Sequence, residues 1–127
     1  MVETLVNDML KEGMIQHSCS PWNSPLFLVP KKDKSFWTVI DFRRVNTATV
    51  DDHYPLPVLN DLLMSLGRGN QIFSSFDLLL GYWQVPLTAD SREITAYSTP
   101  QGHYEWLRMA FGLKMVLLNF QRLINQT

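Results

Sequence analysis

Apolar positions recur with helical spacing at both ends of the chain. The N-terminal stripe is formed by Val2, Leu5, Val6, Met9 and Leu10. Residues at these intervals lie on one face of a helix, and Gly13 is a typical stop signal. The C-terminal stripe is formed by Val116, Leu117, Phe120, Leu123 and Ile124. It reaches Thr127 without a stop signal, so we expect a helix that is cut rather than finished.

Two pairs of short apolar runs flank turn-forming residues, a pattern that predicts β-hairpins. The first pair joins residues 26–29 to residues 36–42 through a polar connection at 31–35. The second pair joins residues 94–98 to residues 103–108 around a turn that contains Pro100 and Gly102.

The middle of the chain has a mixed pattern. Residues 47–54 are expected to be irregular, and Pro57 precedes a helix that ends at Gly67. The predicted buried face of this helix comprises Val58, Leu59, Leu62, Leu63 and Leu66. Residues 71–76 read as a buried strand that ends at Asp77, and a short helical turn is expected over residues 81–85.

The resulting order is helix, hairpin, helix, strand, hairpin and helix, which favours an α+β fold. A chain of 127 residues, 46% hydrophobic and 18% charged, fits one globular domain. No apolar run is long enough for a membrane span, and the N-terminus lacks a signal peptide. We therefore expect an intracellular protein, cytoplasmic or nuclear, that is neither secreted nor in a membrane.

The net charge of −1 gives no indication of a nucleic-acid partner, but the distribution of charge does. Five of the eleven basic residues lie between positions 31 and 44. Such a patch either meets phosphate or is simply the solvated surface of a hairpin. Asp77 is a second candidate, because a carboxylate at the end of a buried strand requires a cation or a partner.

Several ordered motifs together resemble the reverse transcriptase domain of gypsy-type long-terminal-repeat retrotransposons. The first half of the chain carries Val29-Pro30-Lys31-Lys32-Asp33 and Asp41-Phe42-Arg43-Arg44-Val45-Asn46. The matching stretches continue at residues 13–15, 18–25, 54–57, 73–84, 99–105 and 111–113. Because the motifs cover nearly the whole chain in the same order, the resemblance is specific.

The resemblance implies a partial right-hand polymerase fold, with a fingers hairpin and an incomplete antiparallel palm sheet with helices. Residues 1–127 would form a single truncated domain. Within it, residues from about 14 to 50 would be fingers elements, and residues from about 55 to 127 would be palm and returning fingers elements.

The chemistry that the resemblance implies is template-directed nucleotidyl transfer by two metal ions, Mg²⁺ with Mn²⁺ as the alternative. Its substrates are deoxynucleoside triphosphates and an RNA or DNA template-primer. Asp77 falls on the first metal-binding aspartate of the family, and the backbone carbonyl of Leu78 falls on a further metal ligand.

The other site residues implied by the resemblance face the nucleotide. Tyr82 falls on the aromatic that excludes a ribose 2′-hydroxyl, although a core role is the alternative. Lys31 and Lys32 fall on the fingers tip that grips the triphosphate. Phe111, Gly112 and Gln121 fall on or behind the nucleotide pocket, and Gln121 is equally well explained as a structural amide.

The chain departs from the family at several of these positions. Phe36-Trp37 replaces tryptophan and arginine, so the triphosphate-binding arginine is missing; Trp37 is interpreted as hairpin packing. Leu80 replaces a serine, and Ala110 replaces a proline. Residues 115–117 replace Asn-Ala-Pro.

The family's Tyr-x-Asp-Asp block does not occur in the sequence. We therefore expect a reverse transcriptase fragment that is inactive by itself, with the remainder of a polyprotein missing. A non-catalytic nucleic-acid-binding module and a structural remnant completed by another chain remain alternatives.

Overall fold

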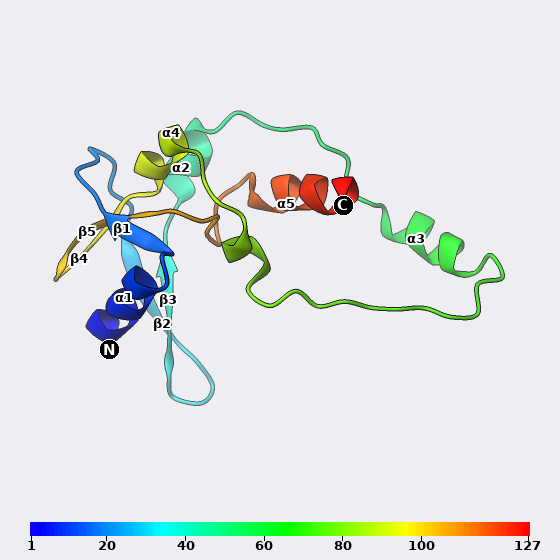
Figure 1. The fold of residues 1–127 in the computed structure, drawn as a ribbon, viewed down its shortest axis with the longest axis horizontal. Helices are drawn as coiled ribbons and strands as arrows, with labels where there is room; N and C mark the ends of the chain where they lie inside the picture. Colours follow the sequence, from blue (N-terminus) through cyan, green and yellow to red (C-terminus); the bar gives the residue numbers. More distant parts are fainter.

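Antiparallel strands and short helices alternate along the chain in a computed structural model that describes residues 1–127. The predicted α+β class is confirmed, with two separate antiparallel sheets (Figure 1). The elements in chain order are α1 Val2–Lys11, β1 Ile15–His17, β2 Leu26–Pro30, β3 Phe36–Ile40, α2 Arg43–Ala48, α3 Leu59–Leu66, η1 Gly81–Gln84, α4 Ala89–Arg92, η2 Glu93–Thr95, β4 Tyr97–Thr99, β5 Gly102–Trp106 and α5 Val116–Gln126.

The core forms around the three-stranded sheet, in which β5 lies between β1 and β4. Ile15 pairs with Trp106 on one side of β5, and Tyr97 pairs with Tyr104 on the other. Helix α1 packs Val6 and Met9 into this core, as its apolar stripe predicts. The second predicted hairpin is confirmed as β4 and β5, although residues 94 and 95, which were expected in its first strand, belong to η2 instead. Strand β1 was not predicted.

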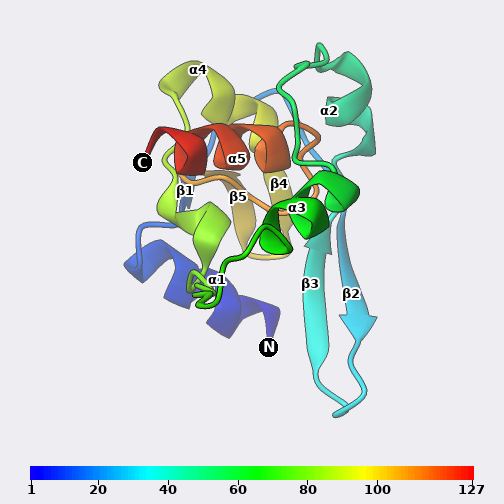
Figure 2. The ribbon, with the colours of Figure 1, turned by 90° about the vertical axis from the view of Figure 1, so that its right-hand side faces the viewer.

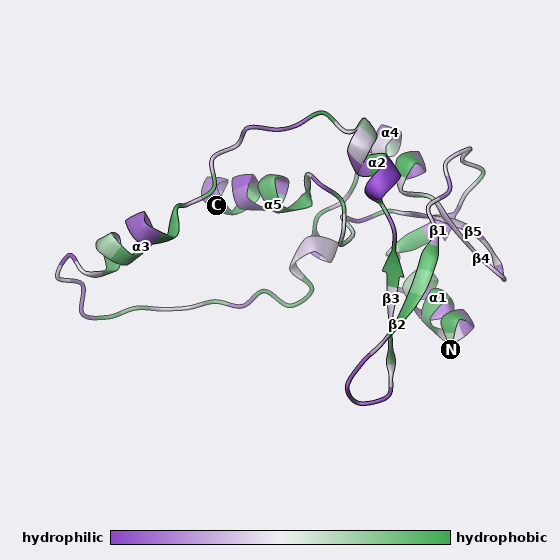
Figure 3. Ribbon diagram, turned by 180° about the vertical axis from the view of Figure 1, so that it is seen from behind, coloured by the Kyte–Doolittle hydropathy of each residue, from purple (hydrophilic) through white to green (hydrophobic).

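The first predicted hairpin is also confirmed, as β2 and β3, with Leu26 opposite Ile40 and Pro30 opposite Phe36. Only the base of this two-stranded ribbon is packed against the core, where Leu26 and Ile40 are partly buried. The ribbon then projects away from the three-stranded sheet (Figure 2). Its strands are largely apolar and its tip is a hydrophilic loop (Figure 3).

Helix α2 was not predicted, because the sequence reading placed an irregular segment from residue 47. The helix is held by burial as well as by its own hydrogen bonds. Phe42 and Val45 are buried in the core, and the Asn46 amide donates to the Phe42 carbonyl at 2.7 Å. Burial of these two side chains explains why the helix extends beyond its weak local pattern.

Residues 58–80 depart most from the prediction. Helix α3 exists, but its leucines are exposed, so the expected buried face is wrong. Residues 71–77 form no strand, and residues 71–78 make no backbone hydrogen bond. The whole segment loops away from the body of the molecule (Figure 1). The physical reason is that no other strand among residues 1–127 lies alongside it to complete a sheet.

Two shorter features complete the chain. The helical turn expected over residues 81–85 is confirmed as η1, and the C-terminal helix is confirmed as α5. Helices α4 and η2 were not predicted; they lead into β4, and Thr95 is buried there. No helix of the structure combines the length and apolarity needed to cross a membrane.

Candidate functional site

Three aromatic side chains from separate segments meet near η1. The ring of Tyr82 lies 5.1 Å from that of Phe111 and 5.2 Å from that of Phe120, measured between centroids, both edge-on. Edge-to-face contact is a favourable geometry for aromatic rings. The structure therefore brings together two residues singled out from the sequence, Tyr82 and Phe111, and adds Phe120 from α5, which was missed.

Gly81 allows η1 to approach α5 this closely. A Cβ atom at Gly81 would lie 3.2 Å from Cζ of Phe120 and 3.7 Å from Cβ of Leu78. The residue before it, Leu80, has φ 51° and ψ 41°, a left-handed conformation that costs a branched side chain about 1–2 kcal/mol. Leu80 is thus one of the departures from the family and also a strained position beside the aromatic group.

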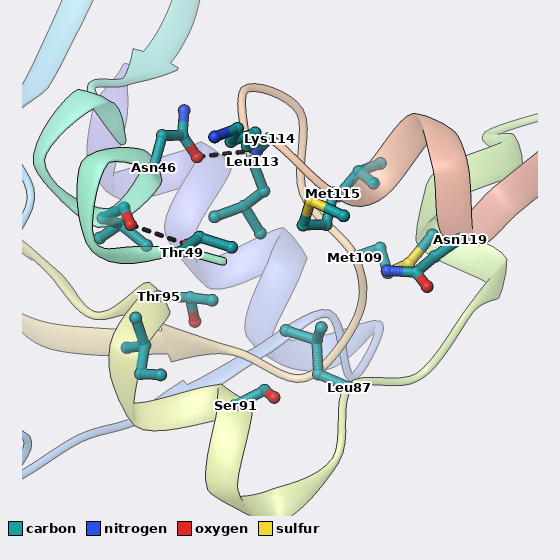
Figure 4. Close-up of a pocket in the computed structure, with 13 residues that line it drawn as sticks. Asn46, Thr49, Leu87, Ser91, Thr95, Met109, Leu113, Lys114, Met115 and Asn119 are labelled. Carbon is teal, nitrogen blue, oxygen red and sulfur yellow. Dashed lines mark hydrogen bonds between the residues drawn. The ribbon is translucent and has the colours of Figure 1, made fainter. Parts of the chain in front are cut away.

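Gly112 forms the turn that follows Phe111. Its φ of +91° is a conformation that favours glycine, and the turn lies against Phe42. The side chain of Asn46 in α2 binds both sides of this turn. Nδ2 donates to the carbonyl oxygen of Gly112 at 2.8 Å. Oδ1 accepts from the amide of Lys114 at 2.7 Å (Figure 4).

Asn46 was quoted from the sequence as part of a motif, but no role was assigned to it. The signal was available, because an asparagine carboxamide can donate and accept at once. Its partners could not be predicted from the sequence, because they lie 66 and 68 residues away along the chain. Gln121, which was assigned a role, donates to Oδ1 of Asn125 at 2.9 Å within α5, as a structural amide would.

Asp77 lies on the exposed, extended segment before η1. The premise that it ends a buried strand is wrong, and its carboxylate makes neither a hydrogen bond nor an ion pair. No group of three or more His, Cys, Asp or Glu side chains in the structure could hold a metal ion. One carboxylate and the Leu78 carbonyl are too few donors, so the residues present do not fit a two-metal centre.

Lys31 and Lys32 occupy the tip of the β2–β3 hairpin. The turn is closed by a hydrogen bond from the Lys31 amide to the Ser35 carbonyl at 2.7 Å. Asp33 accepts from the amide and the hydroxyl of Ser35, and these hydrogen bonds lower the pKa of the Asp33 carboxyl. The tip points away from α5 and the three-stranded sheet, so the lysines and the aromatic group lie in different parts of the molecule (Figure 2).

The segment after α2 is bound to α5 by charged and aromatic contacts. Arg122 forms an ion pair with Asp52 at 2.5 Å and lies over the ring of Tyr54. Asp51 forms an ion pair with Lys114, and the hydrogen bond from Lys114 lowers the pKa of the Asp51 carboxyl. The two adjacent aspartates thus have separate cationic partners and do not form a metal site.

Two shallow cavities lie on either side of the Gly112 turn. The cavity drawn in Figure 4 has a volume of about 250 Å³ and lies among α2, α4 and the start of α5; it contains none of the predicted site residues. The other, about 310 Å³, lies at the base of the β2–β3 hairpin beside Phe27, Arg43 and Gly112. Gly112 is the one predicted site residue that lines it.

Comparison with known proteins identifies a family. Residues 29–127 match the family described as "Reverse transcriptase (RNA-dependent DNA polymerase)". The Pol polyprotein of transposon 297 of Drosophila melanogaster is 43% identical over 98% of this chain, and that of transposon gypsy is 38% identical over 98%. The enzymatic polyprotein of Cauliflower mosaic virus (strain Strasbourg) is 44% identical over 92% of this chain.

These relatives are much longer than the chain, which spans 12% of the transposon 297 polyprotein and 18% of the viral one. Solved structures agree with the assignment. The foamy viral protease–reverse transcriptase in complex with an RNA/DNA hybrid superposes with a TM-score of 0.79 at 27% identity. That match covers 98% of this chain and 17% of the viral protein.

Proposed function

This chain belongs to the reverse transcriptase family, and we propose that its residues contribute the fingers and the start of the palm to an RNA-directed DNA polymerase. The fingers elements extend from about residue 14 to residue 50, and the palm and returning fingers elements from about residue 55 to residue 127. The observation that carries this proposal is the meeting of Tyr82, Phe111 and Phe120 from three segments, beside the Gly112 turn.

Tyr82 and Phe111 are the proposed nucleotide-facing pair. Phe111 is 62% exposed although it touches Tyr82, so its ring has a free surface for a ligand. A flat ring at Tyr82, in edge-on contact with Phe120, discriminates against a ribose 2′-hydroxyl by steric exclusion. Gly112 has no side chain, so the backbone beside Phe111 stays open to a ligand. Gln121 supports the site from α5.

Lys31 and Lys32 are proposed to bind the triphosphate. Both lie at the exposed tip of the hairpin, and an ammonium on a long flexible stem suits a phosphate that must arrive and leave. Because the tip is distant from the aromatic group, binding of a triphosphate to both requires the hairpin to move toward the nucleotide.

Mg²⁺ is the proposed metal, with Asp77 and the Leu78 carbonyl as two of its ligands. A bound divalent ion would supply charge stabilisation for phosphoryl chemistry. The remaining carboxylates are absent from these 127 residues, so we derive no catalytic step through the metal. Because Asp77 is exposed, its carboxylate could share a metal ion with carboxylates from another segment.

The proposed partner is an RNA or DNA template-primer. The foamy viral relatives have been solved in complex with double-stranded DNA and with an RNA/DNA hybrid, which supports this assignment. The polymerase activity itself is proposed for these residues only when they are combined with the further segments that their longer relatives contain.

The test of this proposal is primer extension on an RNA template with Mg²⁺ or Mn²⁺. The 127-residue chain is expected to incorporate no deoxynucleotide, because a missing metal-binding carboxylate removes several kcal/mol of transition-state stabilisation. Joined to the Tyr-x-Asp-Asp segment of a relative, the chain is expected to extend the primer, and Asp77→Asn is expected to abolish this. Incorporation by the 127-residue chain that depends on Asp77 would show that its site is complete.

Non-catalytic nucleic-acid binding is a second candidate function, favoured by the exposed basic tip of the β2–β3 hairpin. Binding of a single-stranded oligonucleotide should weaken as salt rises, since lysines release counterions from phosphates. Neutralising Lys31, Lys32 and Lys34 to Gln should weaken binding and flatten the salt dependence. Lys11→Gln, on α1, is the matched control, and equal effects of both sets of changes would count against this function.

A further inference from the structure

Trp37 is an aromatic residue whose position in the fold does not match the hairpin-packing role expected of it. It lies on β3 opposite Val29, and its side chain is 59% exposed. Its one recorded ring contact is with a cation: Nζ of Lys31 lies 4.2 Å from the centroid of the Trp37 ring. The indole is therefore available to act on Lys31 rather than on the core.

The geometry restrains the lysine at both ends. The Lys31 amide is fixed in the turn by its hydrogen bond to the Ser35 carbonyl, and the ammonium lies over the indole face. A cation over an indole is attracted by the ring quadrupole, and tryptophan is the strongest such partner. The ammonium has three N–H donors, so those directed away from the ring remain free for another acceptor.

We propose that Trp37 is a positioning residue that holds the Lys31 ammonium ready for the phosphate oxygens of a nucleoside triphosphate. The inference rests on the proposed function of Lys31. A free lysine loses conformational freedom when it binds an anion, and one already held over a ring loses less.

Phe36 provides a matched control within the same strand. It is 44% exposed, but it is adjacent to Trp37 and therefore points to the opposite face of the ribbon. Phe36→Leu removes an exposed aromatic side chain without touching the contact with Lys31. Trp37→Phe keeps a ring, Trp37→Leu removes it, and Trp37→Val does so with a residue that suits a strand opposite Val29.

The first measurement is the NMR chemical shift of the Lys31 side-chain methylene protons in the free 127-residue chain. A ring face shields protons above it, so these signals should lie upfield in the unaltered chain and return to ordinary lysine values in Trp37→Leu and Trp37→Val. Phe36→Leu should leave them unchanged. Lys31 signals that do not respond to loss of the indole would overturn the inference.

The second measurement is the affinity for inorganic tripolyphosphate. Trp37→Leu or Trp37→Val should weaken binding about three- to tenfold, which is the expected cost of ordering one flexible side chain. Trp37→Phe should change it less than about twofold, and Phe36→Leu should not change it. In Lys31→Gln, further loss of Trp37 should have no added effect.

The outcomes separate the inference from the function on which it rests. If Lys31→Gln leaves tripolyphosphate binding unchanged, the proposed role of Lys31 fails and the inference fails with it. If Lys31→Gln weakens binding but Trp37→Leu does not, or tightens it, only the inference fails. If loss of Trp37 weakens binding of deoxyadenosine triphosphate but not of tripolyphosphate, the indole stacks on the base and the positioning role is wrong.

Discussion

Asn46 holds Gly112 in place across 66 residues of chain, through a hydrogen bond of 2.8 Å from its Nδ2 to the glycine carbonyl. Its Oδ1 accepts a second hydrogen bond from the Lys114 amide. One carboxamide in α2 thus fixes both ends of the turn that follows Phe111. This links the base of the fingers hairpin to the proposed nucleotide pocket.

Asn46→Ala is expected to lower the free energy of unfolding by about 1–3 kcal/mol, because two hydrogen bonds are lost at about 0.5–1.5 kcal/mol each. Urea unfolding measures the change. Asn46→Asp is the informative control, since it keeps the acceptor for Lys114 but replaces the donor to Gly112 by an oxygen. If the alanine variant is as stable as the unaltered chain, the two hydrogen bonds make no net contribution.

The aromatic contact between Tyr82 and Phe120 is expected to be directly measurable. A double-mutant cycle of Tyr82→Ala and Phe120→Ala should give a coupling energy of about 0.5–1.5 kcal/mol, as for other edge-to-face pairs. Phe73→Ala is the control, because this side chain is exposed on the extended segment and should change stability by less than about 0.5 kcal/mol. Zero coupling would mean that the rings do not meet in solution.

Leu80→Gly is expected to stabilise the chain. The left-handed backbone of Leu80 costs about 1–2 kcal/mol, which glycine does not incur, whereas the greater freedom of glycine in the unfolded chain returns up to about 1 kcal/mol. The expected net gain is about 0.5–1 kcal/mol in urea unfolding. Leu79→Gly lies at an exposed neighbour with ordinary backbone and should instead destabilise the chain.

The ion pair of Asp51 with Lys114 predicts a pH dependence of stability. The hydrogen bond from Lys114 lowers the pKa of the Asp51 carboxyl in the folded chain below its ordinary value of 3.8. Because the folded state binds this proton less readily, the stabilisation is present above about pH 4 and is lost as the pH falls through the lowered pKa. Asp51→Asn should therefore be less stable than the unaltered chain at pH 6, and the difference should vanish near pH 2.

High salt provides the control for that prediction. Both side chains are partly exposed, so added salt should screen their attraction and reduce the difference between Asp51→Asn and the unaltered chain at pH 6. A difference that persists at pH 2 and in high salt would point to packing rather than charge.

Local pattern was a good guide wherever one face of an element meets the core. The stripe of α1 and the runs of the two hairpins were located from spacing alone, because alternation and helical periodicity follow from backbone geometry. The same periodicity located α3 but misjudged its burial, since apolarity does not say whether a neighbour is present to cover a face. Asp77 was assigned to a buried strand for the same reason, and it lies exposed.

The sequence by itself determined the α+β class, the family and most of the elements, all of which depend on near neighbours or on ordered motifs. Tertiary structure alone decided that Asn46 binds the Gly112 turn, that Phe120 packs against Tyr82, and that Lys31 lies over Trp37. The last contact spans one hairpin turn, yet it too depends on which side chains the strand register brings to the same face. Contacts between distant residues depend on how complete elements pack together, and a local sequence pattern does not contain that information.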